Sequence, residues 1–191
     1  CCTSSNAVQV VEAVAAERGV DTVIMIPDEY LAKNVAAQTD IKILTWKGAC
    51  EVHEQFTPQD IADLRDAHPD AVILTHPECP PEVMAEADFA GSTGAMSAYV
   101  KDNQPAKAIL ITECSMSDNV SVENPNVAFV KPCNLCPHMK RITLEGIYEA
   151  LRGMKHEVTV SDDVAARARA SVQAMLDLPK ADTPPHFDTG R

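Results

Sequence analysis

The chain has 191 residues, of which 46% are hydrophobic, a length that can bury the core of one large or two small domains. It carries 16 Lys and Arg residues against 28 Asp and Glu residues, a formal net charge of −12, which disfavours binding to nucleic-acid phosphates. No apolar run approaches the length of a membrane span, and the first residues lack the pattern of a signal peptide. We therefore expect a cytoplasmic protein that binds neither nucleic acid nor membranes.

The chain begins with Cys1 and carries no initiator methionine, so we expect the sequence to be part of a longer protein. Its seven cysteines are Cys1, Cys2, Cys50, Cys79, Cys114, Cys133 and Cys136. Disulfide frameworks are mostly even in number and belong to secreted proteins. The cysteine content therefore favours free thiols, catalysis or metal binding.

Helical and strand-like patterns alternate along the chain. Capping residues before position 7 and a stop at Gly19 delimit a first helix. Residues 22–26 are an apolar, β-branched run, which predicts a strand buried on both faces of a parallel sheet. Further strands are expected at residues 41–46, 71–75, 108–112 and 127–130, and further helices at residues 28–37, from 57, at 81–87, after 94, from 143 and at 161–178. This alternation predicts an α/β fold with parallel sheets.

Part of the sequence repeats, with Cys50 and Cys136 lying 86 residues apart. At this spacing, residues 24–26 align with residues 110–112, Asn34 falls near Asn119, Thr57 aligns with Thr143, and Ile61 aligns with Ile147. Apolar strands, helix starts and a cysteine that keep one register suggest a duplicated α/β unit. The alternative is a chance alignment of two α/β stretches.

Polar and thiol side chains follow the expected strands, in residues 27–29, 47–50, 76–79, 113–114 and 133–136. Ligands of open α/β sheets bind beyond the carboxyl ends of the strands, so we expect these segments to share one edge of the fold. Residues 3–5 and 91–94 stand at helix starts, where they act either as ordinary N-caps or as an anion site.

The chemistry of these segments stays open from the residues alone. Cys133-Asn134-Leu135-Cys136 is a C-x-x-C motif, which is half of a zinc site, a redox pair or part of an iron–sulfur site. Cys79, Cys114 and Cys133 are expected to be small packing residues.

Two histidines and a carboxylate are equally ambiguous. His76 and Glu78 flank Pro77, and they either move protons and orient a substrate or form a solvated turn. His53, three residues after Cys50, has the same two interpretations.

Five motifs taken together resemble quinolinate synthase, and the match runs from residue 1 to about residue 178. They are Cys-Thr-Ser-Ser-Asn-Ala at 2–7, Gly-Ala-Cys-Glu-Val-His at 48–53, His-Pro-Glu-Cys-Pro at 76–80, Gly-Ser-Thr-Gly at 91–94 and Cys-Pro-His-Met-Lys-Arg-Ile-Thr-Leu-Glu at 136–145. The resemblance implies an enzyme of NAD biosynthesis that condenses iminoaspartate with dihydroxyacetone phosphate. It also implies three related units, each a three-layer αβα sandwich, around a pseudo-threefold axis. Each unit gives one cysteine to a 4Fe-4S cluster, whose fourth iron is an open Lewis acid.

The resemblance also implies roles for individual residues. Cys50 and Cys136 are the expected cluster ligands, and Glu78 and His53 the expected catalytic residues. Substrate binding is expected at Ser4, His76, Pro77, Glu78, Ser92 and Thr93. The enzyme that supplies iminoaspartate is a candidate partner.

The family pattern is incomplete in this chain, because its first unit and third cluster cysteine should precede residue 1. We expect residues 1–52 to be a remnant of the second unit, 53–135 the third unit, 136–178 a helical segment and 179–191 a disordered tail. The chain then represents the C-terminal two-thirds of the enzyme and is inactive alone. The alternative function is a non-catalytic metal-binding or redox module that uses Cys133 and Cys136.

Overall fold

The computed structural model describes residues 1–179 and 186–189. Its α-helices are α1 (Ala7–Arg18), α2 (Glu29–Ala36), α3 (Pro58–Ala67), α4 (Pro81–Met84), α5 (Thr93–Asn103), α6 (Ser115–Glu123), α7 (Leu144–Gly153) and α8 (Asp162–Leu176). Its strands are β1 (Thr22–Met25), β2 (Lys42–Thr45), β3 (Ala71–Thr75), β4 (Phe89–Gly91), β5 (Lys107–Ile111), β6 (Ala128–Val130) and β7 (His186–Phe187). Two 3₁₀ helices, η1 (His53–Gln55) and η2 (Met139–Arg141), precede α3 and α7.

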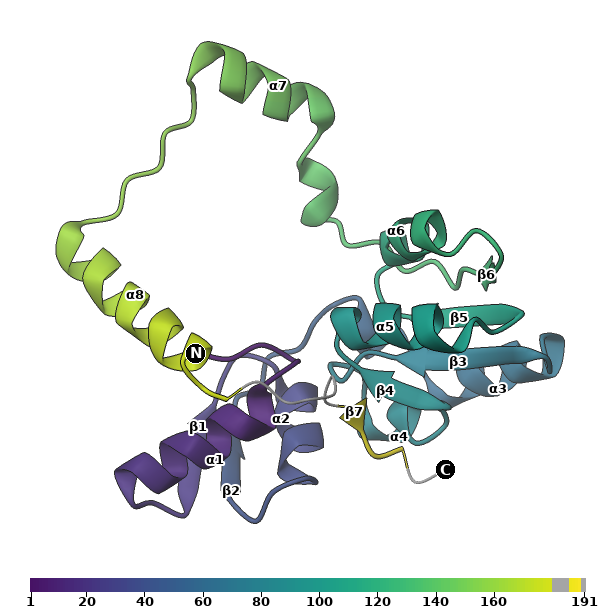
Figure 1. Cartoon of the computed structure of the whole chain (residues 1–191), viewed down its shortest axis with the longest axis horizontal. Coiled ribbons are helices and arrows are strands. Elements are labelled where there is room, and N and C mark those ends of the chain that lie inside the picture. The colour runs from purple at the N-terminus through teal and green to yellow at the C-terminus, as the bar shows by residue number, and fades with distance from the viewer. Residues whose placement is uncertain (180–185, 190–191) are drawn as a thin grey trace.

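The strands form two sheets (Figure 1). Strands β1 and β2 pair in parallel as a two-stranded sheet, and the larger sheet has the order β6-β5-β3-β4-β7. All pairs in the larger sheet are parallel except β4 with the short β7. The α/β fold with parallel sheets that the sequence predicts is therefore confirmed.

The internal repeat is confirmed as a repeat of structure. Six elements recur in the same order, as α1 and α5, β1 and β5, α2 and α6, β2 and β6, η1 and η2, and α3 and α7. The alignment of residues 24–26 with 110–112 is wrong by one residue, because α1 has 12 residues and α5 has 11. Thr22 and Lys107 therefore begin equivalent strands, and Met25 is equivalent to Leu110.

Strand β1 is not buried on both faces as expected. Met25 is buried, whereas Ile24 is 75% exposed. The sequence run is apolar throughout, but only the face toward α1 and α2 is covered by described residues. The opposite face of this sheet carries Ile24, Ile26 and Leu44 and is open to solvent.

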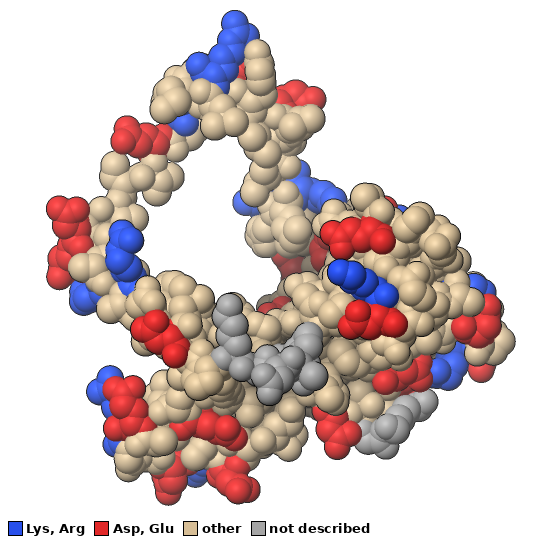
Figure 2. Space-filling model, in the orientation of Figure 1, with Lys and Arg blue, Asp and Glu red and all other residues tan. Residues whose placement is uncertain are grey.

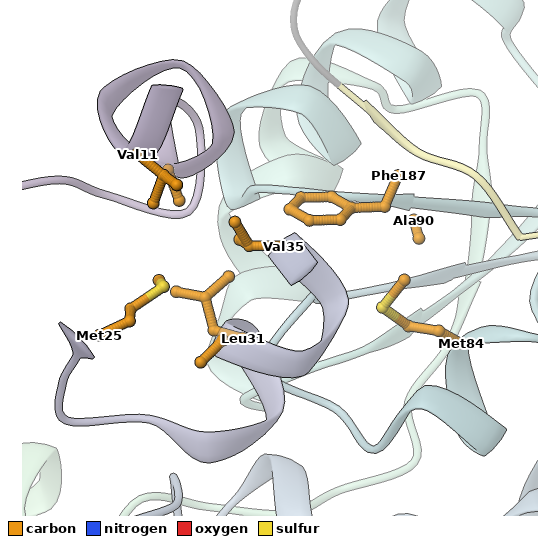
Figure 3. Packing of buried hydrophobic residues seen from close by; sticks show 9 residues of the cluster. Val11, Met25, Leu31, Val35, Met84, Ala90 and Phe187 are labelled. Carbon is orange, nitrogen blue, oxygen red and sulfur yellow. The ribbon is translucent and has the colours of Figure 1, made fainter. Parts of the chain in front are cut away.

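One α-helix and two strands are absent from the sequence prediction, as are the two short 3₁₀ helices. Helix α6 lacks a continuous apolar stripe, and β4 has three residues. The second of these strands is β7, within the tail expected to be disordered; residues 180–185 and 190–191 of that tail lie outside the described residues. Phe187 of β7 is 3% exposed because its ring packs into a cluster with Val35, Met84 and Ala90 (Figure 3). Burial of an aromatic ring of this kind favours an ordered β7.

Helices α7 and α8 form an arm that leaves the sheets and returns to α1 (Figure 1). No residue of either helix is buried. The arm ends against α1, where the Cys1 ammonium group donates to Ser171 Oγ at 3.4 Å. In the described part of the chain, no helix has both the length and the apolar composition that crossing a membrane requires.

Candidate functional site

Hydrogen bonds join the loops that follow β2, β3, β5 and β6 into one edge of the molecule. The His76 N–H donates to the Ile111 carbonyl at 3.2 Å, and the Cys114 N–H donates to the Asn134 carbonyl at 3.1 Å. The loops that carry the two expected cluster cysteines also meet, since His138 Nε2 lies 2.9 Å from Glu51 Oε1. The shared edge that the sequence predicts is therefore present.

Cys50, His53 and Glu78 come together on this edge. One ligand atom from each residue lies within 4.8 Å of the others. His53 Nδ1 is 3.1 Å from Glu78 Oε2, and His53 Nε2 is 2.9 Å from the hydroxyl of Thr112. Nδ1 is buried and makes no hydrogen bond of good geometry, so its attraction to Glu78 is mainly electrostatic. Thr112 was not predicted as a site residue. The only feature of the sequence that indicates such a role is its position directly after the apolar strand β5.

The close approach of these groups changes their protonation. The close contact with His53 lowers the pKa of the Cys50 thiol. Burial lowers the pKa of His53, but its contacts with Cys50 and Glu78 outweigh burial and raise that pKa to about 9. The contact with His53 also lowers the pKa of Glu78. At neutral pH the site therefore holds an imidazolium beside a carboxylate, and the same charges favour ionisation of the Cys50 thiol.

His76 stays neutral beside this charged group. Its ring stacks on His53 with centroids 4.5 Å apart. Burial and the charge of His53 lower the pKa of His76 to about 4. The Glu78 N–H donates to His76 Nδ1 at 3.3 Å, so in the neutral ring the proton is on Nε2. His76 is therefore a fixed hydrogen-bond donor at neutral pH.

Asn34 of α2 holds the loop of the neighbouring unit. Its side-chain amide donates to the carbonyls of Pro77 at 2.8 Å and Cys79 at 3.0 Å. Asn34 is buried, so both bonds form away from water. The buried loop of Pro77 and the half-buried Glu78 are thus positioned from a helix that precedes them by some forty residues in the chain.

In each of the two repeated units, a carboxylate accepts a hydrogen bond from the backbone N–H of the cysteine. Asp28 Oδ2 accepts the Cys50 N–H at 3.0 Å, and Glu113 Oε1 accepts the Cys136 N–H at 3.4 Å. The other oxygen of each carboxylate accepts an N–H at the start of the following helix, from Leu31 or from Ser115. The sequence places both acids among the residues expected at this edge of the fold but assigns neither of them a function. The shared position after equivalent strands is the signal that identifies them.

The structure corrects the expectation that Cys114 and Cys133 are packing residues. They form a disulfide, with Cα atoms 4.8 Å apart. A hydrogen bond from the Cys114 N–H to the Asn134 carbonyl joins the loops that carry Cys114 and Cys133. This contact between distant segments leaves no pattern in the local sequence. Cys79 is fully buried as expected. Cys50 and Cys136 are free thiols, each half-buried.

The expected binding residues at the helix starts make other contacts than the charged group does. Ser92 Oγ accepts the Ala95 N–H at 3.2 Å, as an ordinary N-cap of α5 does, and Thr93 beside it is exposed. Ser4 is half-buried and lines a pocket together with Gln38 and His186. Within the described residues, no hydrogen bond joins Ser4, Ser92 or Thr93 to His53 or Glu78.

The donor set fits an iron–sulfur group in part. Two free thiols end equivalent loops that touch each other, and thiolate sulfur is the usual ligand of such clusters. Among the described residues, no third free cysteine occupies a loop of this kind. Cys1 and Cys2 precede α1, and burial raises the pKa of Cys79 to about 12.

Comparison with known proteins identifies relatives that match 92% or more of this chain. Residues 1–177 match the family described as Quinolinate synthetase A protein. The quinolinate synthase of Caulobacter vibrioides is 60% identical over 98% of this chain and 51% of its own length. Quinolinate synthase 1 of Mesorhizobium japonicum is 63% identical over 92% of this chain and 53% of its own length.

The chain spans about half the length of the curated relatives it matches, which is less than the two-thirds expected from the motifs. The family match nevertheless covers the loops that carry Cys50, Glu78 and Cys136. This chain therefore belongs to the quinolinate synthetase A protein family.

Proposed function

We propose that the chain is the part of a quinolinate synthase that contributes two thiolates of a 4Fe-4S cluster and the acid–base groups of the reaction. The observation that carries this proposal is the meeting of Cys50, His53 and Glu78 beside the loop of Cys136. The disulfide favours the synthase over a module that uses the C-x-x-C motif, because it withdraws Cys133 from metal binding.

The reaction joins iminoaspartate to dihydroxyacetone phosphate and releases inorganic phosphate and two molecules of water to give quinolinate. Cys50 and Cys136 hold the cluster, which supplies an open iron as a Lewis acid when it is bound. Asp28 and Glu113 orient the two cysteine loops through the backbone N–H bonds.

The charged group moves the protons of this reaction. The lowered pKa keeps Glu78 ionised at neutral pH, so its carboxylate is available to accept a proton from substrate carbon or nitrogen. The His53 imidazolium donates a proton to a leaving oxygen, and His76 Nε2–H orients a substrate oxygen. Ser4 and the pair Ser92 and Thr93 bind carboxylate or phosphate groups at helix starts.

Formation of quinolinate requires groups that this chain does not contain, so we propose that the chain alone is inactive. The reaction then needs the third cysteine and the unit that precedes residues 1–52 in the proposed division of the enzyme. The proposed division keeps residues 53–135 as the third unit and 136–178 as a helical segment. The proposed location is the cytoplasm, where the enzyme that supplies iminoaspartate is the candidate partner.

The test uses a fusion in which the unmatched part of the Caulobacter relative precedes this chain. After anaerobic loading with iron and sulfide, the fusion should form quinolinate and the chain alone should not. Cys50→Ser and Cys136→Ser should lose both the cluster spectrum and activity, whereas Cys1→Ser should keep both. Glu78→Gln should keep the spectrum but lose about 100-fold or more in rate. A loaded fusion without turnover, or full activity of Glu78→Gln, would refute the proposal.

A further inference from the structure

Strand β7 continues the larger sheet beside the residues that lead into α5. It pairs antiparallel with β4, where His186 lies opposite Gly91. Gly91 directly precedes Ser92, the N-cap of α5, and Thr93 is the first residue of that helix. The backbone that leads to Ser92 and Thr93 is therefore held between β3 on one side and β7 on the other.

The ring of Phe187 links β4 to the start of α1. Phe187 is 3% exposed and belongs to one cluster with Ala7 and Ala90. In Figure 3 the ring points from β7 toward α1 and α2. Ala7 is the first residue of α1, three positions after Ser4, and Ala90 lies two positions before Ser92. One buried side chain thus packs between the two helix starts that carry proposed substrate contacts.

The residues of β7 also complete the pocket that contains Ser4. His186 and Phe187 line this pocket of about 310 Å³ together with the start of α1. Of the described residues that line it, Glu12 is acidic and none is Lys or Arg. Figure 2 shows more acidic than basic side chains over this part of the surface. An anion at Ser4 therefore gains little ionic attraction, and its affinity depends on the alignment of hydroxyl and backbone N–H groups.

Strand β7 lies beyond the residues that match the family. The family match ends at residue 177, whereas β7 begins at His186. The match with the Caulobacter relative covers 98% of this chain and reaches β7. Strand β7 is therefore an addition to the part of the fold that matches the family.

We propose that β7 is a positioning element that fixes the start of α1 relative to the start of α5, with Phe187 as its anchor. This inference rests on the proposed binding of carboxylate or phosphate groups by Ser4, Ser92 and Thr93. Strand β7 acts through these residues and touches no reacting atom. Its loss should weaken substrate binding but leave the cluster ligands and the proton-transfer groups in place, because none of them belongs to the cluster of Phe187.

Hydrogen exchange on the chain alone tests the anchor without any cluster or activity. The Val10 N–H donates to the Asn6 carbonyl at 2.9 Å, and the Met96 N–H donates to the Ser92 carbonyl at 2.9 Å. These two amides report on the starts of α1 and α5. In Phe187→Ala both should exchange about fivefold or more faster than in the parent chain. Unchanged exchange of the β5 amides shows that the larger sheet stays folded.

Two point variants and a truncation complete this test. Phe187→Leu keeps a large apolar side chain and should restore slow exchange. The matched control is Val122→Ala, at an 81% exposed position of α6, which should have no effect. A chain that ends at Leu178 lacks β7 and should reproduce the effect of Phe187→Ala. Unchanged exchange of both amides in this truncation would overturn the proposal.

Kinetics of the loaded fusion separate positioning from general stability. Phe187→Ala should raise the KM of one substrate about tenfold while kcat stays within about twofold and the cluster spectrum is unchanged. A raised KM for dihydroxyacetone phosphate identifies a phosphate at these helix starts, and a raised KM for iminoaspartate identifies a carboxylate. Phe187→Leu should recover most of the KM.

The two measurements together decide the proposal. Faster exchange with unchanged KM values would mean that β7 only covers the edge of the sheet, and this result would overturn the positioning role. A fall in kcat at constant KM would also overturn it. A fusion that forms no quinolinate even with Phe187 in place would refute the proposed function, whereas the exchange of the chain alone would still decide whether Phe187 anchors the two helix starts.

Discussion

The carboxylate of Asp28 accepts a hydrogen bond from the backbone N–H of Cys50 at 3.0 Å. The same side chain caps α2 through the Leu31 N–H. One residue therefore couples the start of a helix to the loop that carries a cysteine. Burial raises the pKa of Asp28, while the two backbone N–H groups oppose this rise.

Replacement of this acid tests the coupling. Asp28→Asn places an amide N–H₂ against one of the two backbone donors, so a buried N–H loses its acceptor. We expect a loss of about 1–3 kcal/mol in the free energy of unfolding, measured by urea denaturation. Asp40→Asn makes the same chemical change at an exposed position and should cost less than about 0.5 kcal/mol. Equal stability of the two variants would contradict the role given to Asp28.

The His53 contact predicts a reactive thiol at Cys50 in the metal-free chain. The close contact with His53 lowers the pKa of Cys50, so iodoacetamide should modify Cys50 faster than an ordinary cysteine at neutral pH. His53→Gln should slow this modification, because it removes the contact that lowers the pKa of Cys50 and so reduces the thiolate fraction. Mass spectrometry of the modified peptides measures the rate.

The control for this experiment is His138→Gln. His138 contacts Glu51 rather than the thiol of Cys50, and this variant should leave the rate unchanged. Cys79 should remain unmodified in all samples, because burial raises its pKa to about 12. An unchanged rate in His53→Gln would show that His53 does not activate the thiol.

The neutral state of His76 predicts a loss of stability in acid. Its folded-state pKa of about 4 lies below the ordinary value of 6.5, so the unfolded chain binds a proton first as the pH falls. Stability should therefore decrease from about pH 6.5 toward pH 4, by an amount on the order of 3 kcal/mol. His76→Gln should flatten this part of the curve, measured by urea denaturation at several pH values. A variant curve parallel to that of the parent chain would exclude His76 as the cause.

The two equivalent isoleucines give a matched pair of truncations. Ile61→Ala removes a side chain that is fully buried and should cost about 2–5 kcal/mol. Ile147→Ala alters the same position of the exposed helix α7 and should cost less than about 0.5 kcal/mol in this chain. Thermal or urea unfolding of both variants measures the difference. A large cost at Ile147 would mean that α7 is already buried in solution.

The sequence predicts the fold where one local pattern suffices. Apolar β-branched runs separated by helical periodicity indicate the parallel sheets, and the family motifs select Cys50, His53 and Glu78. Contacts between distant segments leave no local pattern. The hydrogen bond of His53 with Thr112 and the bonds of Asn34 with the Pro77 loop are of this kind. Strand β7 was missed for the same reason, because two residues carry no periodicity.

Because Asn34 donates hydrogen bonds to the Pro77 loop, the geometry of the site depends on both repeated units. Helix α2, which carries Asn34, fixes the backbone loop that carries His76 and Glu78. Separation of the two sheets would therefore release the loop of His76 and Glu78 even if both sheets stayed folded. Loss of the Asn34 hydrogen bonds should therefore abolish the proposed activity under conditions in which the protein stays folded.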